Sequence, residues 1–493
     1  MGSSYGAGLE KGQKAHAVCV PFPAQGHINP MLQFAKLLHR HGFRITFVLT
    51  HFNYRRLVRA QGEDAVNGLP DFRFESIADG LPNSDNDATQ DISLLCDATT
   101  KKCLAPFRRL LADLNNSSLG PAVTCIVADG GMSFTLDAAS ELSIPNVLFW
   151  TSSASGYLAF QHYHHLLERG IIPLKDMSDV TNGFLDTEVD WIPGFMKGMR
   201  LKDFPSWIRT TDREEVVLNY LIYEMKRAAM GSAIIFNTFD DLEEPALNAL
   251  RRFLPPVYAV GPFSILSHHL LPSDSPLNTI GTSLWKEDDS CLKWLDDHNM
   301  KPHSVVYVSF GSITVMTDDQ LIEFAWGLAN SGYKFIWVIR PDQFQGEANI
   351  IPAEFVEETK GRGMMVSWTA QRKLLAHPAI GAFLSHCGWN STIEGLCGGV
   401  PMICWPFFSE QLTNCRYACA EWGVGVELAG DVKRAAVEAL IREVMAGEKG
   451  REMRRRAAEW KERAVKAAGG PHGGSTVNFN RVVNEVLLPR KQI

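Results

Sequence analysis

The chain has 493 residues, of which 45% are hydrophobic and 21% charged, which is typical of a folded globular protein but too long for one hydrophobic core. The formal net charge of -7 comes without a long basic run, which excludes the electrostatic footprint of a nucleic-acid-binding protein. No stretch reaches the roughly 20 consecutive apolar residues of a membrane-spanning helix, so no transmembrane segment is expected. The ten cysteines form no CxxC pair and mostly lie in apolar runs, so we expect reduced, buried thiols and a cytoplasmic protein.

The first part of the chain alternates between strand and helix patterns. Residues 1–14 have no apolar signal core and are expected to form a disordered tail. From Ala15 onward, β-branched runs predict strands, and three- and four-residue spacings of apolar residues predict helices. We assign residues 15–262 to a first domain with a parallel sheet covered on both faces. Its predicted strands are 15–22, 44–50, 123–130, 145–152, 232–239 and 257–262, and two of its helices are 28–42 and 132–142.

A second alternating series follows a break in the periodicity. The Ser- and Pro-rich segment 263–285 is interpreted as an interdomain linker, and residues 286–475 as a second domain. The terminal segment 476–493 contains a short helix that we expect to pack back toward the first domain. The predicted strands of the second domain are 304–312, 334–340, 363–368, 382–388, 401–406 and 424–428, followed by helices from 432 to about 468.

These patterns predict the α/β class, with two Rossmann-like doubly wound domains facing across a cleft. Ligands of such sheets bind beyond the carboxyl ends of the strands. Neither domain has a GxGxxG fingerprint or a GxxxxGK[ST] loop, so the sequence gives no support to a nicotinamide or ATP site. We therefore expect another kind of nucleotide site, formed by residues that directly follow strands.

The densest group of unusual residues runs from Trp368 to Gln411. Its centre, SHCGWNST, lies where a predicted strand ends and a helix begins, with Asn390 as the expected helix cap. The backbone N–H groups and partial positive charge of a helix N-terminus suit a diphosphate, to which His386 adds a donor or a charge. Further along that helix, the carboxylate of Glu394 suits ribose hydroxyls, and Trp368 offers an aromatic face to a base. Each of these residues alone is more often structural, so the interpretation depends on their combination.

Together these residues resemble the signature box of the plant secondary-product UDP-glycosyltransferases, which are family 1 glycosyltransferases. The resemblance covers nearly the whole chain from Ala15, and it implies the glycosyltransferase B fold. The segments HFNYRRLVRAQG, RLKDFP and WPFFSEQLTNCRY are similar to the branch that acts on terpenoids, cyanohydrins and cytokinins. The matching residues of the box are Trp368, Gln371, His377, the run His386–Ser391, Glu394, Pro401, Pro406, Glu410 and Gln411.

The resemblance also implies a role for each donor-binding residue. Uridine contacts are assigned to Trp368, Gln371 and Glu394. Diphosphate contacts are assigned to Ser312, His386, Asn390 and Ser391. Sugar contacts are assigned to Thr151, Glu410 and Gln411, and Gln411 together with Trp389 is similar to the members that prefer glucose. Gly26 is counted with the donor-binding residues and is expected to let the backbone bend before His27. The family more often has Asp where this chain has Glu410.

The catalytic pair is predicted in the first domain. His27 follows the first strand, ahead of the helix at 28–42, and Asp129 closes the strand at 123–130. An aspartate bonded to an imidazole fixes its tautomer and stabilises the imidazolium, so the histidine can act as a general base. Both positions match the catalytic His and Asp that the resemblance implies. Attack on the anomeric carbon from the face opposite UDP then inverts its configuration.

The predicted function is therefore an inverting UDP-glucosyltransferase that acts on small molecules. It moves glucose from UDP-glucose to a hydroxyl of a small apolar acceptor, such as a terpenoid, flavonoid or cyanohydrin, and gives a β-O-glucoside. The acceptor pocket is expected to draw on the aromatic segments 156–167 and 191–208. Three alternatives stay open: another UDP-sugar donor, a UDP-sugar-binding sensor, and a UDP-sugar epimerase that needs no acceptor.

No cofactor and no metal are expected, and the partners are the two small-molecule substrates. The one concentration of histidines, His162, His164 and His165, is not an HExxH pattern and is interpreted as pocket lining or surface. We expect no nucleic-acid partner and a monomer.

Overall fold

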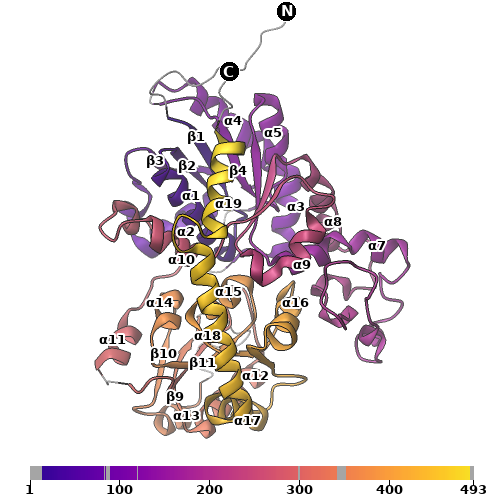
Figure 1. Cartoon of the computed structure of the whole chain (residues 1–493), viewed down its shortest axis with the longest axis vertical. Coiled ribbons are helices and arrows are strands. Elements are labelled where there is room, and N and C mark those ends of the chain that lie inside the picture. The colour runs from indigo at the N-terminus through magenta and orange to yellow at the C-terminus, as the bar shows by residue number, and fades with distance from the viewer. Residues whose placement is uncertain are drawn as a thin grey trace, which may run out of the picture. The chain divides into compact units, whose positions relative to one another are not determined.

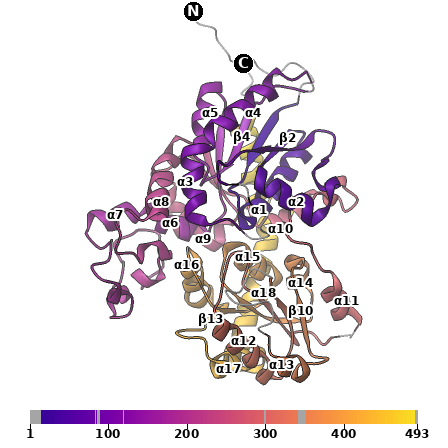
Figure 2. The same ribbon diagram turned by 180° about the vertical axis from the view of Figure 1, so that it is seen from behind.

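The computed structural model of the chain describes residues 14–82, 84, 89–118, 120–297, 300–340 and 351–488, and it forms two compact units (Figures 1 and 2). Unit 1 contains the chain up to Phe195, Trp207–Leu284, and the chain from Ala467 onward. Unit 2 contains Met196–Ser206 and Trp285–Lys466. The predicted tail 1–14 lies outside the described residues except for Lys14.

Unit 1 is built on a parallel sheet with the strand order β3-β2-β1-β4-β5-β6-β7. Six of these strands confirm the predicted ones, and β3 was missed. Its sequence, FRFESI, alternates between apolar and polar residues at the sheet edge, where one face of a strand stays partly exposed. The strands are β1 His16–Val20, β2 Arg44–Thr50, β3 Phe72–Ile77, β4 Cys125–Asp129, β5 Asn146–Trp150, β6 Ala233–Phe236 and β7 Val257–Ala259.

The helices of unit 1 connect and cover these strands. They are α1 Gln25–Arg40, α2 His51–Gln61, α3 Ile92–Lys102, α4 Leu104–Asn116, α5 Phe134–Leu142, α6 Ala154–Gln161, α7 Tyr163–Glu168, α8 Val216–Arg227, α9 Asp240–Leu250, α10 Phe263–Leu270 and α19 Gly474–Arg481.

Helix α1 begins earlier than the predicted start at residue 28. The turn out of β1 is made by residues 21–24, so Gly26 and His27 both lie in the first turn of α1. The expectation that Gly26 bends the backbone before the helix is therefore wrong. Gln25 anchors this helix end instead, because its side chain accepts from the backbone N–H of Leu284 at 2.6 Å and donates to the carbonyl of Thr282 at 3.1 Å.

The segment 263–285 is not an interdomain linker over most of its length. Its first part forms α10, which packs against α1, and its residues Phe263 and Leu266 are fully buried. The Phe263 ring lies 5.7 Å from the ring of Phe34 on α1. The Ser and Pro content suggested a linker, whereas the few apolar residues are spaced so that they share one buried face.

Unit 2 is built on a second parallel sheet, with the order β10-β9-β8-β11-β12-β13. All six strands confirm predicted ones. They are β8 Val305–Ser309, β9 Lys334–Val338, β10 Gly363–Val366, β11 Ile380–Ser385, β12 Met402–Cys404 and β13 Gly425–Glu427. The helices are α11 Ser290–Asp297, α12 Asp318–Ser331, α13 Ala353–Glu358, α14 Gln371–Ala376, α15 Trp389–Gly398, α16 Gln411–Arg416, α17 Arg434–Ala446 and α18 Glu448–Ala468, and a π-helix, Tyr417–Glu421, continues α16.

Unit 2 includes a short segment that the sequence placed in the first domain. Within Met196–Ser206, the backbone N–H of Ser206 donates to the carbonyl of Ser409 at 3.2 Å, and the carbonyl of Asp203 accepts from the Thr413 hydroxyl at 2.7 Å. The first domain is therefore not the continuous stretch 15–262. Contiguity in sequence could not reveal this exchange, because the partners are about two hundred residues apart.

Helix α19 packs within unit 1. Asn478 on α19 donates to the carbonyl of Ala259 at 2.9 Å, and the buried ring of Phe479 lies 5.7 Å from that of Phe34 (Figure 1). The chain passes from unit 2 to unit 1 inside α18, between Lys466 and Ala467, so the second domain does not extend to residue 475 as predicted. Among the described helices, none combines the length and apolarity needed to cross a bilayer.

The two sheets share one topological property. In each, the strand order reverses beside the first strand of the unit, between β1 and β4 in unit 1 and between β8 and β11 in unit 2. Loops that leave neighbouring strands in opposite directions at such a switch point create a crevice at the carboxyl edge, where open α/β sheets bind ligands. The topology therefore makes the ends of these four strands the expected ligand sites.

Candidate active site

The switch point of unit 1 brings His27 and Asp129 together. His27 follows β1, Asp129 closes β4, and Nδ1 of the imidazole lies 2.8 Å from Oδ2 of the carboxylate. The Asp129 side chain is 1% exposed, whereas that of His27 is 35% exposed. A buried carboxylate thus holds an imidazole that solvent and small molecules can reach, which is the arrangement of a general base and its orienting acid.

Thr151 joins this pair. It directly follows β5, the neighbour of β4, and its hydroxyl oxygen lies 2.8 Å from Nδ1 of His27. The sequence assigned Thr151 to the sugar and did not foresee this bond. Because Nδ1 is engaged by the oxygens of Asp129 and Thr151, Nε2 is the ring nitrogen placed to exchange a proton with a substrate.

Buried groups on α8 hold the loop that follows Asp129. The backbone N–H of Gly131 donates to Oδ1 of Asp129 at 3.0 Å, and the hydroxyl of Tyr220 donates to the carbonyl of Gly131. Glu224 accepts from the backbone N–H of Ser133 at 3.2 Å, and burial raises the pKa of Glu224 to about 8. Sequence reasoning missed both α8 residues, because nothing in the apolar pattern of that helix shows that it covers this loop.

The switch point of unit 2 places His386 between two glycines. A Cβ atom on Gly311, after β8, would lie 2.3 Å from Nε2 of His386, and one on Gly388 would lie 2.5 Å from it. Only glycine allows both backbone segments to approach the ring this closely. Burial, and secondarily the charge of Arg340, lowers the pKa of His386 to about 4. The ring is therefore neutral near pH 7, and of the two predicted contributions, a donor or a charge, only the donor remains.

Helix α15 begins beside this ring. Its N-cap is Gly388, and Cys387 before it has a positive φ of 63°. The prediction of Asn390 as the cap is wrong, because this tight turn starts the helix two positions earlier. The first internal bond of the helix runs from the N–H of Thr392 to the carbonyl of Gly388 at 3.0 Å. The N–H groups of the preceding turn, which includes Asn390 and Ser391, point out of the helix end and suit an anion.

Gln371 connects the residues predicted to bind uridine. Its amide nitrogen donates to Oε2 of Glu394 at 2.9 Å and to the hydroxyl of Ser391 at 3.0 Å, and its oxygen accepts from the Tyr307 hydroxyl at 3.2 Å. Burial raises the pKa of Glu394, and the bond from Gln371 opposes that rise. Tyr307 on β8 was missed, because it reads as an ordinary core residue of an apolar strand.

Trp368 is held by a second tryptophan. Its half-buried ring stacks on that of Trp285, with centroids 4.7 Å apart and an interplanar angle of 26°. Trp285 is 5% exposed, so it fixes the orientation of Trp368 from one face. An aromatic ring fixed in this way offers a preorganised surface for stacking a base.

Arg340 supports the loop that contains Ser312. Its guanidinium donates to the carbonyl of Gly311 and, at 3.0 Å, to that of Thr314, and its side chain is almost fully buried. Ser312 lies in this loop and is partly exposed. Sequence reasoning did not single out Arg340, although a charged residue directly after the apolar run FIWVI could have indicated it.

Glu410 and Gln411 lie at the start of α16. Oε2 of Glu410 accepts from the Ser409 hydroxyl at 2.8 Å. Oε1 of Gln411 accepts from the backbone N–H groups of Phe407 and Phe408 at 2.9 and 3.1 Å, so its amide nitrogen is the end suited to a ligand. Trp389, in contrast, is 2% exposed and packs 6.1 Å from Trp422, which gives it a role in the core.

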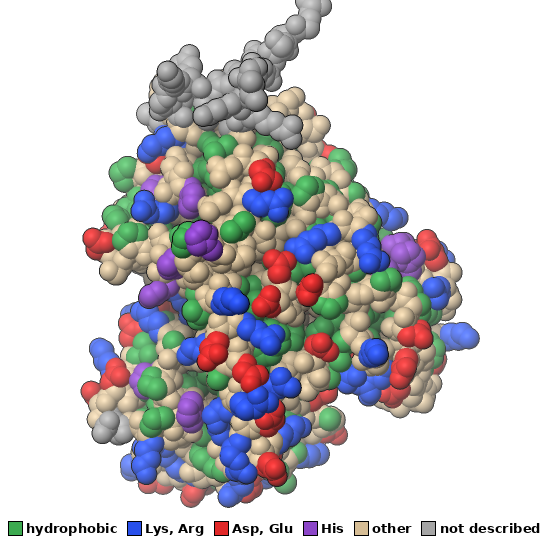
Figure 3. All heavy atoms as spheres, viewed as in Figure 1, with side chains coloured by type: hydrophobic (Ala, Val, Ile, Leu, Met, Phe, Trp, Pro, Cys, Tyr) green, Lys and Arg blue, Asp and Glu red, His purple; other side chains and the backbone are tan. Residues whose placement is uncertain are grey.

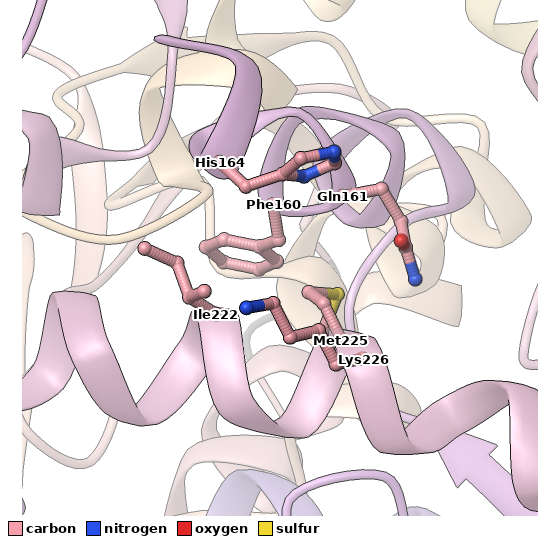
Figure 4. A pocket seen from close by; sticks show the side chains of 6 residues that line it. All are labelled: Phe160, Gln161, His164, Ile222, Met225 and Lys226. Carbon is pink, nitrogen blue, oxygen red and sulfur yellow. The ribbon is translucent and has the colours of Figure 1, made fainter. Parts of the chain in front are cut away.

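The aromatic residues of 156–167 mostly belong to the core. Tyr157, Phe160 and Tyr163 are buried, and a small pocket of about 80 Å³ lies between α6, α7 and α8. In Figure 4, Phe160 forms one wall and the side chains from α8 form the facing wall. Its volume is well below the roughly 300 Å³ of a typical ligand pocket, so these walls alone do not form the predicted acceptor pocket. The lining residues are Phe160, Gln161, His164, Ile222, Met225 and Lys226.

The histidine group and the loop 191–208 have structural partners. Nδ1 of His162 lies 2.9 Å from Nδ1 of His165, and burial lowers the pKa of His162 to about 4. The guanidinium of Arg169 lies 3.8 Å from the ring of Trp191. The loop itself is divided, since Met196–Ser206 belongs to unit 2.

On the face shown in Figure 3, basic and acidic side chains are interspersed, which gives no extended surface for a polyanion.

Comparisons with known proteins identify the family of the chain. Residues 13–181 match the family described as "Glycosyltransferase, N-terminal domain", and residues 278–466 match "UDP-glucoronosyl and UDP-glucosyl transferase". The chain is 55% identical over 480 residues to 7-deoxyloganetin glucosyltransferase of Gardenia jasminoides, covering 97% of this chain and 98% of that protein. It is 56% identical over 477 residues to (R)-mandelonitrile beta-glucosyltransferase of Prunus dulcis, with coverage of 97% and 98%.

A solved structure gives the same result for the fold. The crystal structure of UDP-glucose: anthocyanidin 3-O-glucosyltransferase in complex with UDP is similar to this chain with a TM-score of 0.80 and 26% identity. The similarity covers 96% of this chain and 99% of that one. The predicted glycosyltransferase B fold is confirmed.

Proposed function

The chain belongs to the family of UDP-glucuronosyl and UDP-glucosyl transferases, and from this premise we propose how its residues transfer glucose from UDP-glucose to an alcohol. The observation that carries the proposal is the bonded pair His27–Asp129 at the carboxyl edge of the unit 1 sheet. Glycosyl transfer needs a base for the acceptor and groups that bind the leaving group. The pair His27–Asp129 supplies the base, and the N-terminus of α15 with the uncharged hydrogen-bond donors of unit 2 binds the leaving group.

The base acts at the acceptor hydroxyl. The proton of the acceptor hydroxyl passes to Nε2 of His27, while the hydroxyl oxygen forms a bond to the anomeric carbon of glucose. The bond from that carbon to the UDP oxygen breaks, and the electron pair leaves with UDP. Asp129 stabilises the imidazolium formed, because its carboxylate lies 2.8 Å from Nδ1. Attack opposite the leaving group inverts the anomeric centre, and the name of the Prunus dulcis relative specifies a β-glucosyl product.

The donor is held by unit 2. Trp368 stacks on uracil, while Gln371 and Glu394 bind the base and ribose. His386, Asn390, Ser391 and Ser312, with the N-terminus of α15, bind the diphosphate. Backbone N–H groups and a neutral His386 stabilise the charge that builds up on UDP, so the reaction needs no cofactor or metal. Thr151, Glu410 and Gln411 contact the sugar, and Gly26 lines the donor site.

The acceptor is a small apolar alcohol, and the terpenoid and cyanohydrin substrates in the names of the relatives indicate its class. The presence of both His27 and Asp129 argues against a silent UDP-sugar sensor.

We further propose that the protein acts as a monomer in the cytoplasm. The cysteines support a reducing compartment, because eight of the ten are buried and all are free thiols.

The test is to incubate the purified protein with UDP-glucose and a panel that contains 7-deoxyloganetin, mandelonitrile and flavonoid alcohols. We expect an acceptor gain of one glucosyl group by mass spectrometry, with β anomeric configuration by NMR and undiminished turnover in EDTA. Competing UDP-galactose and UDP-rhamnose identify the donor. UDP-glucose isomerised without any acceptor, or bound without turnover on every acceptor, would contradict the proposal.

A further inference from the structure

Four cysteine side chains of unit 2 gather behind the proposed donor site. Cys387 lies in the turn after β11, Cys404 ends β12, Cys415 lies on α16, and Cys419 lies on the π-helix that follows. The Sγ atoms of Cys387, Cys404 and Cys415 all lie within 4.8 Å of one another, and Sγ of Cys419 lies 4.0 Å from that of Cys415. The first three are at most 2% exposed, and Cys419 is half-buried.

The tertiary fold creates this cluster. Strands β11 and β12 are parallel neighbours whose carboxyl ends meet at one edge, which brings Cys387 to Cys404. Cys415 and Cys419 are four residues apart on consecutive helical turns, so they share a face. No CxxC spacing marks the group, and therefore the sequence did not reveal it.

The spacing of the sulfur atoms suits a metal ion. A Zn–S bond is about 2.3 Å, so sulfur atoms in a tetrahedral thiolate site are roughly 3.8 Å apart. The three mutually close thiols would have to contract by about 1 Å or less to reach that spacing. Thiolate groups prefer soft ions such as Zn²⁺, Cd²⁺ and Cu⁺. Among the described residues, no other group of three His, Cys, Asp or Glu side chains brings its ligand atoms within 4.8 Å of one another.

The surroundings disfavour a nucleophilic or redox-sensing role for these thiols. Burial raises the pKa of Cys387 far above its usual value. The hydrogen bonds with Cys387 and Cys419 lower the pKa of Cys415, but the bond with Cys404 and burial outweigh them and raise it to about 11. Reactive and oxidation-prone cysteines are thiolates at neutral pH, and these are not. An oxidant needs a thiolate that is already present, whereas a metal ion displaces the thiol proton as it binds, so a raised pKa does not exclude metal binding.

We propose that Cys387, Cys404, Cys415 and Cys419 form a binding site for one soft, thiophilic metal ion, and that its occupation weakens binding of the UDP-sugar. Binding of M²⁺ releases three or four thiol protons to solvent and leaves a thiolate complex with net charge of −1 or −2, with no change of oxidation state. The ion takes no part in glucosyl transfer.

The link to the donor follows from the position of Cys387, and it rests on the proposed donor site. Cys387 stands between His386 and Gly388, directly before the N-terminus of α15, and its carbonyl accepts from the side-chain amide of Asn414 at 2.9 Å. A negative thiolate complex behind this helix end opposes its partial positive charge, which the diphosphate uses. Contraction of the cluster also pulls on the turn that holds His386.

Titration of the reduced full-length protein with Cd²⁺ tests the site. We expect one equivalent to bind, with the ultraviolet charge-transfer absorption of Cd–thiolate bonds and with one bound ion in native mass spectrometry. The variant Cys415→Ala/Cys419→Ala should lose this absorption and at least 100-fold in Cd²⁺ affinity. Cys397→Ala, a half-buried cysteine of α15 outside the cluster, is the matched control and should bind like the wild type.

UDP-glucose binding to the metal-free and Cd²⁺-loaded protein, measured by calorimetry, tests the link. We expect loading to weaken binding several-fold in the wild type and in Cys397→Ala. Absence of thiolate absorption in the wild type, or its retention in the double variant, would overturn the site, and equal UDP-glucose affinities would overturn the link. Failure of the metal-free protein to bind UDP-glucose would instead count against the proposed function, and the Cd²⁺ titration would still decide the site.

Discussion

The candidate sites of the two units lie at equivalent positions of their sheets but are built from different chemical groups. In unit 1 the site is a small set of side chains bonded to one another: His27, Asp129 and Thr151. In unit 2 the part of the site proposed for the diphosphate is largely backbone, namely a glycine-lined turn and a helix end, around a His386 that is neutral near pH 7. The same topology thus positions the proposed base in one unit and, in the other, a mostly uncharged group of donors for the proposed diphosphate site.

Under the proposed function, this difference follows from what each unit does to its substrate. A base must change its charge during the reaction, so it needs a fixed counter-charge and access to the substrate, as His27 has. A leaving group that already carries charge is best held by dipoles that are in place before the reaction. Substitutions in unit 1 should therefore reduce turnover, and substitutions in unit 2 should reduce donor affinity.

The largest effect is expected for His27→Ala. Loss of the base should lower kcat by about 1,000-fold, within the range of general acid–base catalysis, and leave the Kd of UDP unchanged within about twofold. Steady-state kinetics and calorimetry measure the two quantities. His39→Ala, on the same helix, is the control and should keep full turnover. A large rise in the Kd of UDP for His27→Ala would contradict the assignment of catalysis to unit 1 and of donor binding to unit 2.

Asp129→Asn should have the next largest effect. The amide keeps the shape of the side chain but carries no charge to stabilise the imidazolium, so we expect kcat to fall about 100-fold or more. The melting temperature provides the check on folding, because Asp129 also accepts from the N–H of Gly131. Turnover within a factor of three of the wild type would show that the carboxylate does not support the base.

Glu394→Ala sharpens the other side of the comparison. Hydrogen bonds to charged groups contribute about 1.5–3 kcal/mol, so the Kd of UDP should rise at least tenfold, with less change in kcat at saturating donor. Glu427→Ala, a carboxylate at the end of another strand of unit 2, is the control. If only the KM of the acceptor changed, the nucleotide would not be bound by Glu394.

Tyr307→Phe should have a modest effect. It removes the hydroxyl that donates to Gln371 at 3.2 Å and keeps the ring that stacks on Phe383 in the core. A neutral hydrogen bond contributes about 0.5–1.5 kcal/mol, so we expect a Kd of UDP raised about two- to tenfold. A melting temperature within a few degrees of the wild type would separate this effect from loss of packing. An unchanged Kd would remove Tyr307 from the donor site.

The smallest effect is expected for the pH dependence of donor binding. Because the pKa of His386 is lowered to about 4, the ring stays neutral from pH 8 down to about pH 5.5, and its protonation begins only below that range. The Kd of UDP-glucose, whose diphosphate diester does not titrate there, should change less than twofold over this range. Binding that tightens strongly at pH 5.5 and loses this dependence in His386→Gln would show a charged imidazole at the diphosphate.

Much of the fold was predictable because each strand carries its own signal. Of the thirteen strands that the described residues form, twelve appear as apolar, β-branched runs, and β3 at the sheet edge was missed because half of its residues are polar. The unit boundaries were less predictable. Composition marked 263–285 as a linker, although α10 packs into unit 1, and nothing local shows that Met196–Ser206 belongs to unit 2.

The sequence by itself determined the family of the chain and the candidate site residues: polar side chains directly after apolar strands, and the ordered box from Trp368 to Gln411. Only the tertiary structure decided how these residues are arranged and which groups surround them. It joined Thr151 to His27, made His386 neutral, placed Tyr307 beside Gln371 and gathered four thiols behind the helix end. The physical reason is that hydrogen bonds, desolvation and metal coordination depend on distances of a few ångströms between segments far apart in the chain, and local patterns do not encode those distances.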